Sequence, residues 1–170
     1  STTEATSCAD SGSAPATGSN TPTGATSSVA SVSMKYPANA IYDFIPATGA
    51  KVVAPDEIYD VAADIFSPNA LGAIINPTTL PRLKVKVIAG GANNQLATPD
   101  MGEKVLEKGV LYAPDYVING GGIINVAAEI SGTYDPAWVE AKVQRLVQTL
   151  GEVLDQAKSE NRASNRVADQ

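Results

Sequence analysis

The 170-residue sequence contains no histidine, a single cysteine and no long apolar run. Without histidine or clustered cysteines, a zinc site and a Ser-His-Asp catalytic triad are excluded, and we expect no bound metal. Cys8 has no partner for an internal disulfide, which favours a reducing cytoplasm. No apolar segment approaches the ~18 residues of a membrane-spanning helix, so we expect no contact with a membrane.

Positive charge is also scarce, because 12 Lys and Arg residues stand against 18 Asp and Glu residues. The formal net charge of −6 and the pI near 4.6 argue against a general surface for nucleic acids or anionic membranes. Hydrophobic residues make up 44% of the sequence, which suffices for one domain with its own core.

Large apolar side chains are rare at the start of the sequence, which consists mostly of Ser, Thr, Ala, Gly and Pro. Such a segment cannot bury enough apolar surface to offset the entropy lost on ordering. We therefore expect a disordered low-complexity tail over residues 1–45 and a folded domain over residues 46–170. A linker or a glycosylated stalk is the functional alternative to a tail without a role.

From Gly49 onward, short apolar runs alternate with helical patterns, as in α/β domains with a parallel sheet. Strands are expected at residues 51–53, 64–66, 85–89 and 110–112. Helical segments are expected near residues 55–59 and at 70–75, 78–83, 98–108, 116–130 and 136–157. The last helix is the clearest, because its apolar residues recur at helical spacing and leave a polar opposite face.

Polar clusters follow three of the expected strands, at residues 67–72, 90–96 and 112–122. The middle cluster places the adjacent amides of Asn93 and Asn94 after two glycines. Amides offer donors and acceptors together, and α/β folds bind ligands at the carboxyl ends of strands. Taken alone, paired asparagines in a glycine-rich turn are more often turn formers.

Read together, these clusters resemble the dinucleotide-binding half of the Glu/Leu/Phe/Val (amino acid) dehydrogenases, and the leucine and phenylalanine members most of all. The resemblance rests on segments 92–96 (ANNQL) and 111–119 (LYAPDYVIN) and runs from about Gly49 to the end of the sequence. It implies a partial Rossmann-like, doubly wound fold with parallel strands and a long C-terminal helix. It also implies NAD-dependent oxidative deamination of an L-amino acid to its 2-oxo acid, by a homo-oligomer in the intact enzyme.

The same resemblance implies roles for individual residues. The implied cofactor contacts are Asn69, Ala70, Leu71, Gly91, Ala92, Asn93 and Asn119. The implied substrate contacts are Asn94, Ile123 and Val126. Asn119 would hold the nicotinamide carboxamide, and Asn94 would reach the substrate's amino group. The aliphatic side chains of Ile123 and Val126 favour an apolar amino acid, although without the resemblance both would be assigned to the core.

The sequence also departs from the family pattern. It has no Gly-x-Gly-x-x-Gly turn after a strand, and it lacks the domain that carries the family's catalytic lysines. We therefore assign no catalytic residue and expect a fragment that is inactive alone. The strands near Val52 and Ile65 would present an uncovered edge, which predicts poor solubility, self-association or partial folding. The alternative function is a non-catalytic association module that pairs with intact dehydrogenase subunits through its terminal helix.

Overall fold

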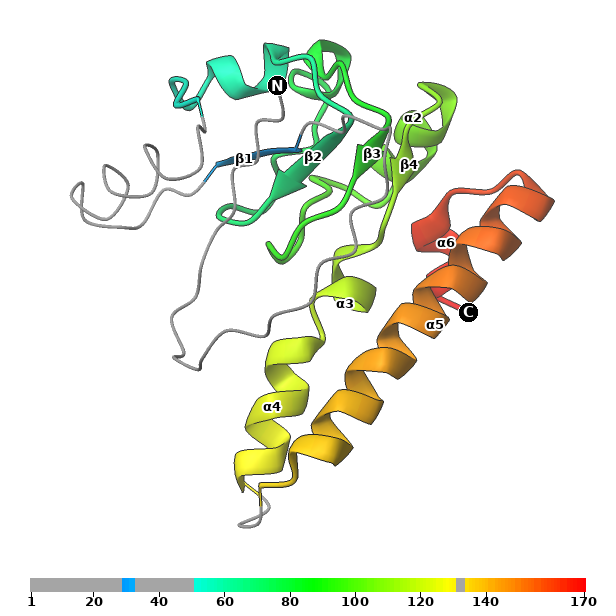
Figure 1. Cartoon of the computed structure of the whole chain (residues 1–170). Coiled ribbons are helices and arrows are strands. Elements are labelled where there is room, and N and C mark those ends of the chain that lie inside the picture. The colour runs from blue at the N-terminus through cyan, green and yellow to red at the C-terminus, as the bar shows by residue number, and fades with distance from the viewer. Residues whose placement is uncertain (1–28, 33–50, 131–133) are drawn as a thin grey trace, which may run out of the picture.

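The computed structural model describes residues 29–32, 51–130 and 134–170 (Figure 1). Within these ranges the elements are, in chain order, β1 (Val29–Val32), the 3-10 helix η1 (Glu57–Asp60), β2 (Ile65–Pro68), the 3-10 helix η2 (Leu80–Arg82), β3 (Val87–Ile88), α2 (Met101–Glu107), β4 (Leu111–Tyr112), α3 (Asp115–Ile118), α4 (Gly121–Ile130), α5 (Pro136–Glu160) and α6 (Ser164–Ala168). None of the helices in these ranges is long and apolar enough to cross a membrane.

The strands form one parallel sheet in the order β1-β2-β3-β4. Ile65 pairs with Val87, and Val87 pairs in turn with Leu111, so adjacent strands end at the same edge. The predicted α/β class with a parallel sheet is confirmed. Because the strands are parallel, the polar segments that follow β2, β3 and β4 leave the sheet on one side.

Strand β1 lies within residues 1–45, for which the sequence predicts a low-complexity tail. Its residues pair with β2 from Val29 opposite Ile65 to Val32 opposite Pro68. The four residues of β1 include two valines, and β-branched side chains suit a strand even within a Ser/Thr/Ala-rich segment. β1 also covers the edge of β2 that the sequence predicted to be open. The rest of residues 1–45, including Cys8, lies outside the described residues.

Most other expected elements are present, with bounds that differ by a few residues. β2, β3 and β4 lie at the predicted strands, α2 lies within the predicted helix at residues 98–108, and the positive φ of Gly109 (74°) ends that helix. The longest helix, α5, begins after Asp135, whose carboxylate accepts hydrogen bonds from the backbone N–H groups of Ala137 at 2.9 Å and Trp138 at 3.3 Å. The predicted long C-terminal helix is thus confirmed.

Three of the secondary-structure predictions are wrong. Residues 51–53 form no strand, and Val52 is 62% exposed. Residues 70–75 form no helix, because the N–H groups of Ala73 and Ile75 donate across to the carbonyls of Asn94 and Gln95 at 2.6 and 3.0 Å. The single helix expected at residues 116–130 is split into α3 and α4 at positions 119–120.

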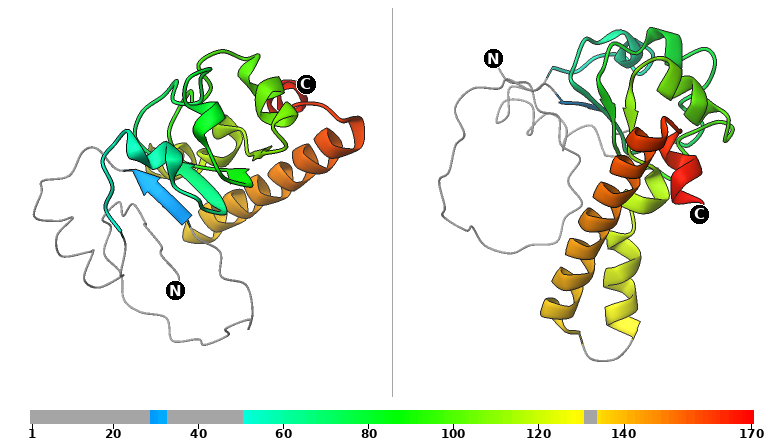
Figure 2. Two further views of the ribbon diagram at one scale, coloured as in Figure 1. Left: turned by 90° about the horizontal axis from the view of Figure 1, so that it is seen from above. Right: turned by 90° about the vertical axis from the view of Figure 1, so that its right-hand side faces the viewer.

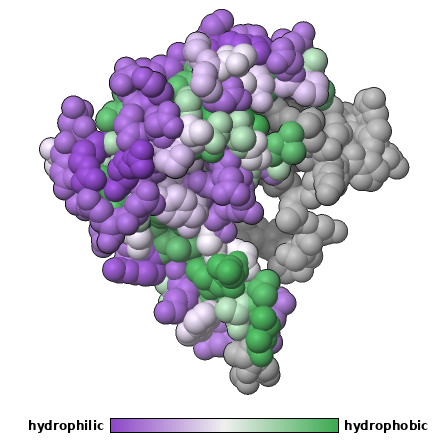
Figure 3. Space-filling view, turned by 180° about the vertical axis from the view of Figure 1, so that it is seen from behind, coloured by the Kyte–Doolittle hydropathy of each residue, from purple (hydrophilic) through white to green (hydrophobic). Residues whose placement is uncertain are grey.

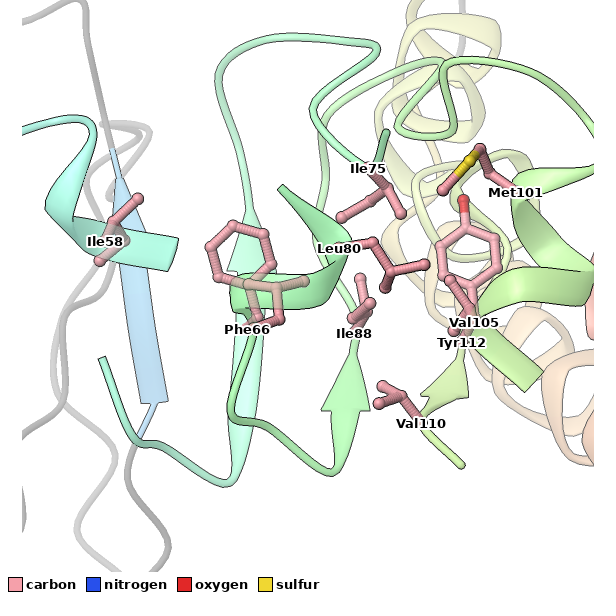
Figure 4. Packing of buried hydrophobic residues seen from close by; sticks show 10 residues of the cluster. Ile58, Phe66, Ile75, Leu80, Ile88, Met101, Val105, Val110 and Tyr112 are labelled. Carbon is pink, nitrogen blue, oxygen red and sulfur yellow. The ribbon is translucent and has the colours of Figure 1, made fainter. Parts of the chain in front are cut away.

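The hydrophobic core fills the space between the sheet, η2 and α2 (Figure 4). Ile75, Ile88 and Val105 are fully buried, and Phe66 and Tyr112 are nearly so. These side chains come from segments that also lead into the polar clusters. The core therefore fixes the positions from which the candidate site residues extend.

The C-terminal helix α6 is fastened to α2 and to the end of β4, beside α5 (Figure 2). The hydroxyl of Ser164 donates to the carbonyl of Tyr112 at 2.6 Å, and Asn165 Nδ2 donates to the carbonyl of Pro99 at 3.0 Å. These bonds attach α6 to the end of β4 and to the segment before α2, and they explain why buried polar side chains occur in α6.

An ion pair between Arg166 and Glu103 supports this docking, with Nε to Oε1 at 2.7 Å. The hydrogen bond from Arg166 lowers the pKa of the Glu103 carboxyl in the folded chain. The pair therefore stabilises the fold at pH values above the pKa that this carboxyl has in the unfolded chain. This stabilisation is lost as the pH falls through the pKa of the folded chain. We expect Glu103→Gln to lower the Tm by ~2 °C at neutral pH and to have no effect near pH ~3.

Thermal unfolding followed by circular dichroism at the two pH values measures this difference. The matched control is Glu107→Gln, which removes a more exposed pair with Lys104 (3.3 Å) and is expected to leave the Tm unchanged. A loss of equal size at both pH values would mean that Glu103 acts through packing and not through its charge.

Candidate functional site

The candidate site lies where β2, β3 and β4 end side by side. The N–H of Ala89 donates to the carbonyl of Phe66 at 3.0 Å, and the N–H of Ala113 donates to the carbonyl of Ile88 at 2.9 Å. One step further, the N–H of Ala92 donates to the carbonyl of Pro68 at 2.9 Å. The segments that follow the strands therefore stay in contact after the regular sheet pairing ends.

Asn69 joins the end of β2 to the turn after β3. Its Nδ2 donates to the carbonyl and to the hydroxyl of Ser67, both at 3.0 Å. Its Oδ1 accepts a hydrogen bond from the N–H of Gly91 at 2.7 Å. The amide is thus held with a fixed orientation between Ser67 and Gly91, and it links two of the expected cofactor contacts, Asn69 and Gly91.

The turn at residues 90–93 packs very closely against the end of β2. A Cβ atom on Gly90 would lie 2.2 Å from the carbonyl oxygen of Pro68. The turn is also held by Gln95, which is fully buried. Its Nε2 donates to the carbonyls of Gly90 at 2.5 Å and Ala92 at 3.0 Å. The sequence predicted no role for Gln95, although Gln95 lies in segment 92–96, which carries the family resemblance.

Asn93 and Asn119 are brought together from two different segments. Nδ2 of Asn119, at the C-terminal end of α3, donates to Oδ1 of Asn93 at 2.5 Å. Within the described part of the chain, no further partner is found for Nδ2 of Asn93 or Oδ1 of Asn119. This pair therefore presents one donor group and one acceptor group to a ligand.

Asn94 adopts a left-handed backbone conformation with φ of 53°. Its N–H donates to Oδ2 of Asp115 at 2.5 Å. Oδ1 of Asp115 accepts from the hydroxyl of Tyr112 at 2.9 Å, and Asp115 is buried. Burial, together with the charge of Asp115, raises the pKa of Tyr112 well above its usual value, so its hydroxyl remains a donor.

Ala70 and Leu71 lie on the other side of Asn69. Both are exposed, and Leu71 is 53% exposed. They line an apolar pocket whose other lining residues are Pro55, Ile58, Tyr59, Phe66, Pro68, Asn69 and Ile74. Three of the expected cofactor contacts therefore share one pocket.

Ile123 and Val126 lie on α4, beyond the break at Asn119 and Gly120. They are 74% and 48% exposed, so the alternative assignment of both to the core is wrong. Figure 3 shows apolar surface at the end of the molecule where α4 lies. The hydrogen bonds described above bring the amides together, whereas these two residues belong to a separate exposed surface.

No group of three or more His, Cys, Asp or Glu side chains that could hold a metal ion is found among the described residues. The polar groups that converge at the strand ends are instead amides, backbone groups and one buried carboxylate. Such a donor set suits a neutral polar ligand that is recognised by hydrogen bonds.

Comparison with known proteins identifies the family. The family model described as Glutamate/Leucine/Phenylalanine/Valine dehydrogenase matches residues 23–168. Leucine dehydrogenase of Thermoactinomyces intermedius is 51% identical over 121 residues, which cover 71% of this chain and 33% of that protein. L-tryptophan dehydrogenase of Nostoc punctiforme is 47% identical over 121 residues, with 71% and 34% covered. The chain belongs to the glutamate/leucine/phenylalanine/valine dehydrogenase family, as its motifs predicted.

Solved structures agree with this assignment. The crystal structure of L-tryptophan dehydrogenase from Nostoc punctiforme superposes with a TM-score of 0.75 at 40% identity, over 84% of this chain and 42% of that one. A hetero-hexameric glutamate dehydrogenase from Thermus thermophilus, at 19% identity and a TM-score of 0.57, shows the fold alone. The chain spans about a third of the length of the curated relatives named above.

Proposed function

We propose that this chain forms the nicotinamide- and substrate-binding part of an NAD-dependent dehydrogenase for an apolar L-amino acid. The observation that carries the proposal is the set of linked side-chain amides at the carboxyl ends of three adjacent parallel strands. Asn69 is bonded to Gly91, and Asn119 is bonded to Asn93. Ligands of open α/β sheets bind at this edge, and family membership supplies the class of reaction.

The residues at this edge fit a nicotinamide. A bound nicotinamide dinucleotide would supply the hydride acceptor for the reaction. Overall, the amino acid would lose a hydride from Cα and a proton from its nitrogen, and water would then yield the 2-oxo acid and ammonia. Nδ2 of Asn93 and Oδ1 of Asn119 match the acceptor and donor of a carboxamide, and they add no charge beside it. The exposed Gly91 lets the ligand approach the backbone closely, and Ala92 is buried beneath it.

Ala70 and Leu71 extend this surface along the proposed nicotinamide ribose. Ala70 directly follows Asn69, whose amide is held by hydrogen bonds to Ser67 and Gly91, and Leu71 comes next in the chain. Positional precision matters for hydride transfer, since the donor and acceptor carbons must be held within a fraction of an ångström.

On the substrate side, we propose that Asn94 contacts the amino group and that Ile123 and Val126 contact an apolar side chain. The exposure of the latter two is consistent with a surface that is completed by another part of the intact enzyme. We propose no catalytic residue in this chain. We further propose that the intact enzyme is a cytoplasmic homo-oligomer and that this chain alone does not turn over.

Two assays on the full chain test these claims separately. With leucine, valine or phenylalanine and NAD, we expect no increase in NADH absorbance, whereas an intact homologous leucine dehydrogenase gives a clear signal under the same conditions. In a fluorescence titration, we expect NADH to bind to the chain. Appreciable turnover would refute the proposed inactivity, and the absence of NADH binding would refute the proposed cofactor site.

A second candidate function is an association module that pairs with intact dehydrogenase subunits. The observation in its favour is apolar exposure along the terminal helix α5, where Val147 is 63% and Trp138 is 42% exposed. Nζ of Lys142 lies over the ring of Trp138, 5.5 Å from its centroid. Co-purification of the chain with an intact homologue, weakened by Val147→Lys, supports this function; a monomer that never co-purifies rules it out.

A further inference from the structure

Asp115 is a buried carboxylate beside the candidate site, and none of the roles assigned so far uses it. It is 7% exposed, and its two oxygens accept hydrogen bonds from the hydroxyl of Tyr112 and the N–H of Asn94. None of the ion pairs found among the described residues involves Asp115. A carboxylate that is buried without a cation depends on such donors for its stability.

The backbone of Asn94 is fixed on both sides by other segments. Its φ of 53° lies in the left-handed region, which asparagine adopts more readily than most residues other than glycine. Its N–H donates to Asp115 at 2.5 Å, and its carbonyl accepts the N–H of Ala73 at 2.6 Å. Ala73 itself has a φ of 57°. The bond to Asp115 therefore selects one backbone conformation among those open to Asn94.

Helix α3 contacts two successive residues of the turn after β3. Asp115 and Asn119 lie four residues apart, so they share one face of the helix. Asp115 accepts from the backbone of Asn94, and Asn119 donates to the side chain of Asn93 at 2.5 Å. The hydroxyl of Tyr112, at the end of β4, supports Asp115 from the core side.

We propose that Asp115 is a positioning residue for the candidate site. Its carboxylate fixes the backbone of Asn94 and thereby sets the directions in which the Asn93 and Asn94 side chains leave the turn. Hydrogen bonds to a carboxylate are shorter and stronger than those to a neutral acceptor, so a neutral replacement holds the turn less firmly. The inference rests on the proposed function, because the cofactor and substrate contacts of these amides are what require fixed directions.

The test compares Asp115→Asn with the matched control Asp169→Asn in the full chain. Asp169 also accepts from a tyrosine hydroxyl, that of Tyr116 at 2.7 Å, but it is exposed and does not bond to the turn. We expect the Asn94 amide proton to resonate far downfield in the unmodified chain and the control, and to move upfield in Asp115→Asn. The Kd for NADH is expected to rise about tenfold in Asp115→Asn alone.

An Asn94 resonance that stays in place in Asp115→Asn overturns the proposal. So does a resonance that moves without any loss of NADH affinity. If the unmodified chain does not bind NADH, the proposed function fails, and the Asn94 resonance still decides whether Asp115 holds this backbone. Should Asp115→Asn fail to fold, the coupling across the hydrogen bond between the Asn94 nitrogen and Asp115 Cγ is measured in the unmodified chain, and its absence overturns the proposal.

Discussion

Replacing Gly90 with alanine is expected to lower the free energy of unfolding by about 3 kcal/mol. The new Cβ would lie 2.2 Å from the carbonyl oxygen and 2.4 Å from the nitrogen of Pro68. These are backbone atoms, and the same carbonyl accepts the N–H of Ala92 at 2.9 Å. The clash therefore cannot be relieved by turning a side chain, and it forces the turn after β3 away from β2.

Denaturant unfolding of the full chain measures this loss, and Gly151→Ala is its matched control. Gly151 lies in α5, where an added Cβ meets nothing within 4 Å. That substitution is expected to raise the free energy of unfolding by roughly 0.5–1 kcal/mol, because alanine favours a helix over glycine. Equal effects of the two substitutions would contradict the close packing of the turn against β2.

Asn119→Asp is expected to weaken NADH binding about 30-fold, a loss of about 2 kcal/mol. Nδ2 of Asn119 donates to Oδ1 of Asn93 at 2.5 Å, and an aspartate would place two acceptor oxygens against each other unless the Asn93 amide turns over. An Asn93 amide that turns over donates Nδ2 to the aspartate, and this donor is then lost to the carboxamide. The aspartate would also add a negative charge where the proposed ligand group is neutral.

The control for this prediction is Asn161→Asp, which makes the same chemical change at an exposed residue that ends α5 in the left-handed conformation. Fluorescence titration with NADH, together with a thermal melt of each variant, separates a loss of binding from a loss of folding. An Asn119→Asp chain that folds and binds NADH as well as the Asn161→Asp chain would remove Asn119 from the proposed cofactor site.

Local sequence patterns were sufficient to predict the class of fold. The β-branched runs before residues 67 and 90 predicted strands. The glycines and amides after them indicate ligand contacts at one sheet edge, and this site stays a prediction. At that edge Asn69 bonds to Gly91, and Asn119 bonds to Asn93. The periodic apolar pattern of α5 likewise predicted its length closely, because amphipathic spacing over many turns is a strong signal.

Features set by distant segments were not predictable from local patterns. Ala73 leaves the helical region because its N–H bonds to the carbonyl of Asn94, which is far away in sequence. The carboxylate of Asp115 accepts hydrogen bonds from Asn94 and Tyr112, and the sequence near Asp115 does not reveal the contact with Asn94. The Ser/Thr/Ala-rich composition around β1 gave no indication of a strand, and β1 forms by pairing with β2. Each outcome depends on a tertiary partner and not on local preference.

Whether the strand-end amides bind nicotinamide is tested most directly by NMR of the full chain during a titration with NADH. We expect the side-chain NH₂ resonances of Asn69, Asn93 and Asn119 to move together and to saturate at one Kd. That of Asn161, the exposed residue at the C-terminal end of α5, is expected to stay in place. Unmoved resonances at the three site residues, with binding detected elsewhere or not at all, would contradict the proposed site.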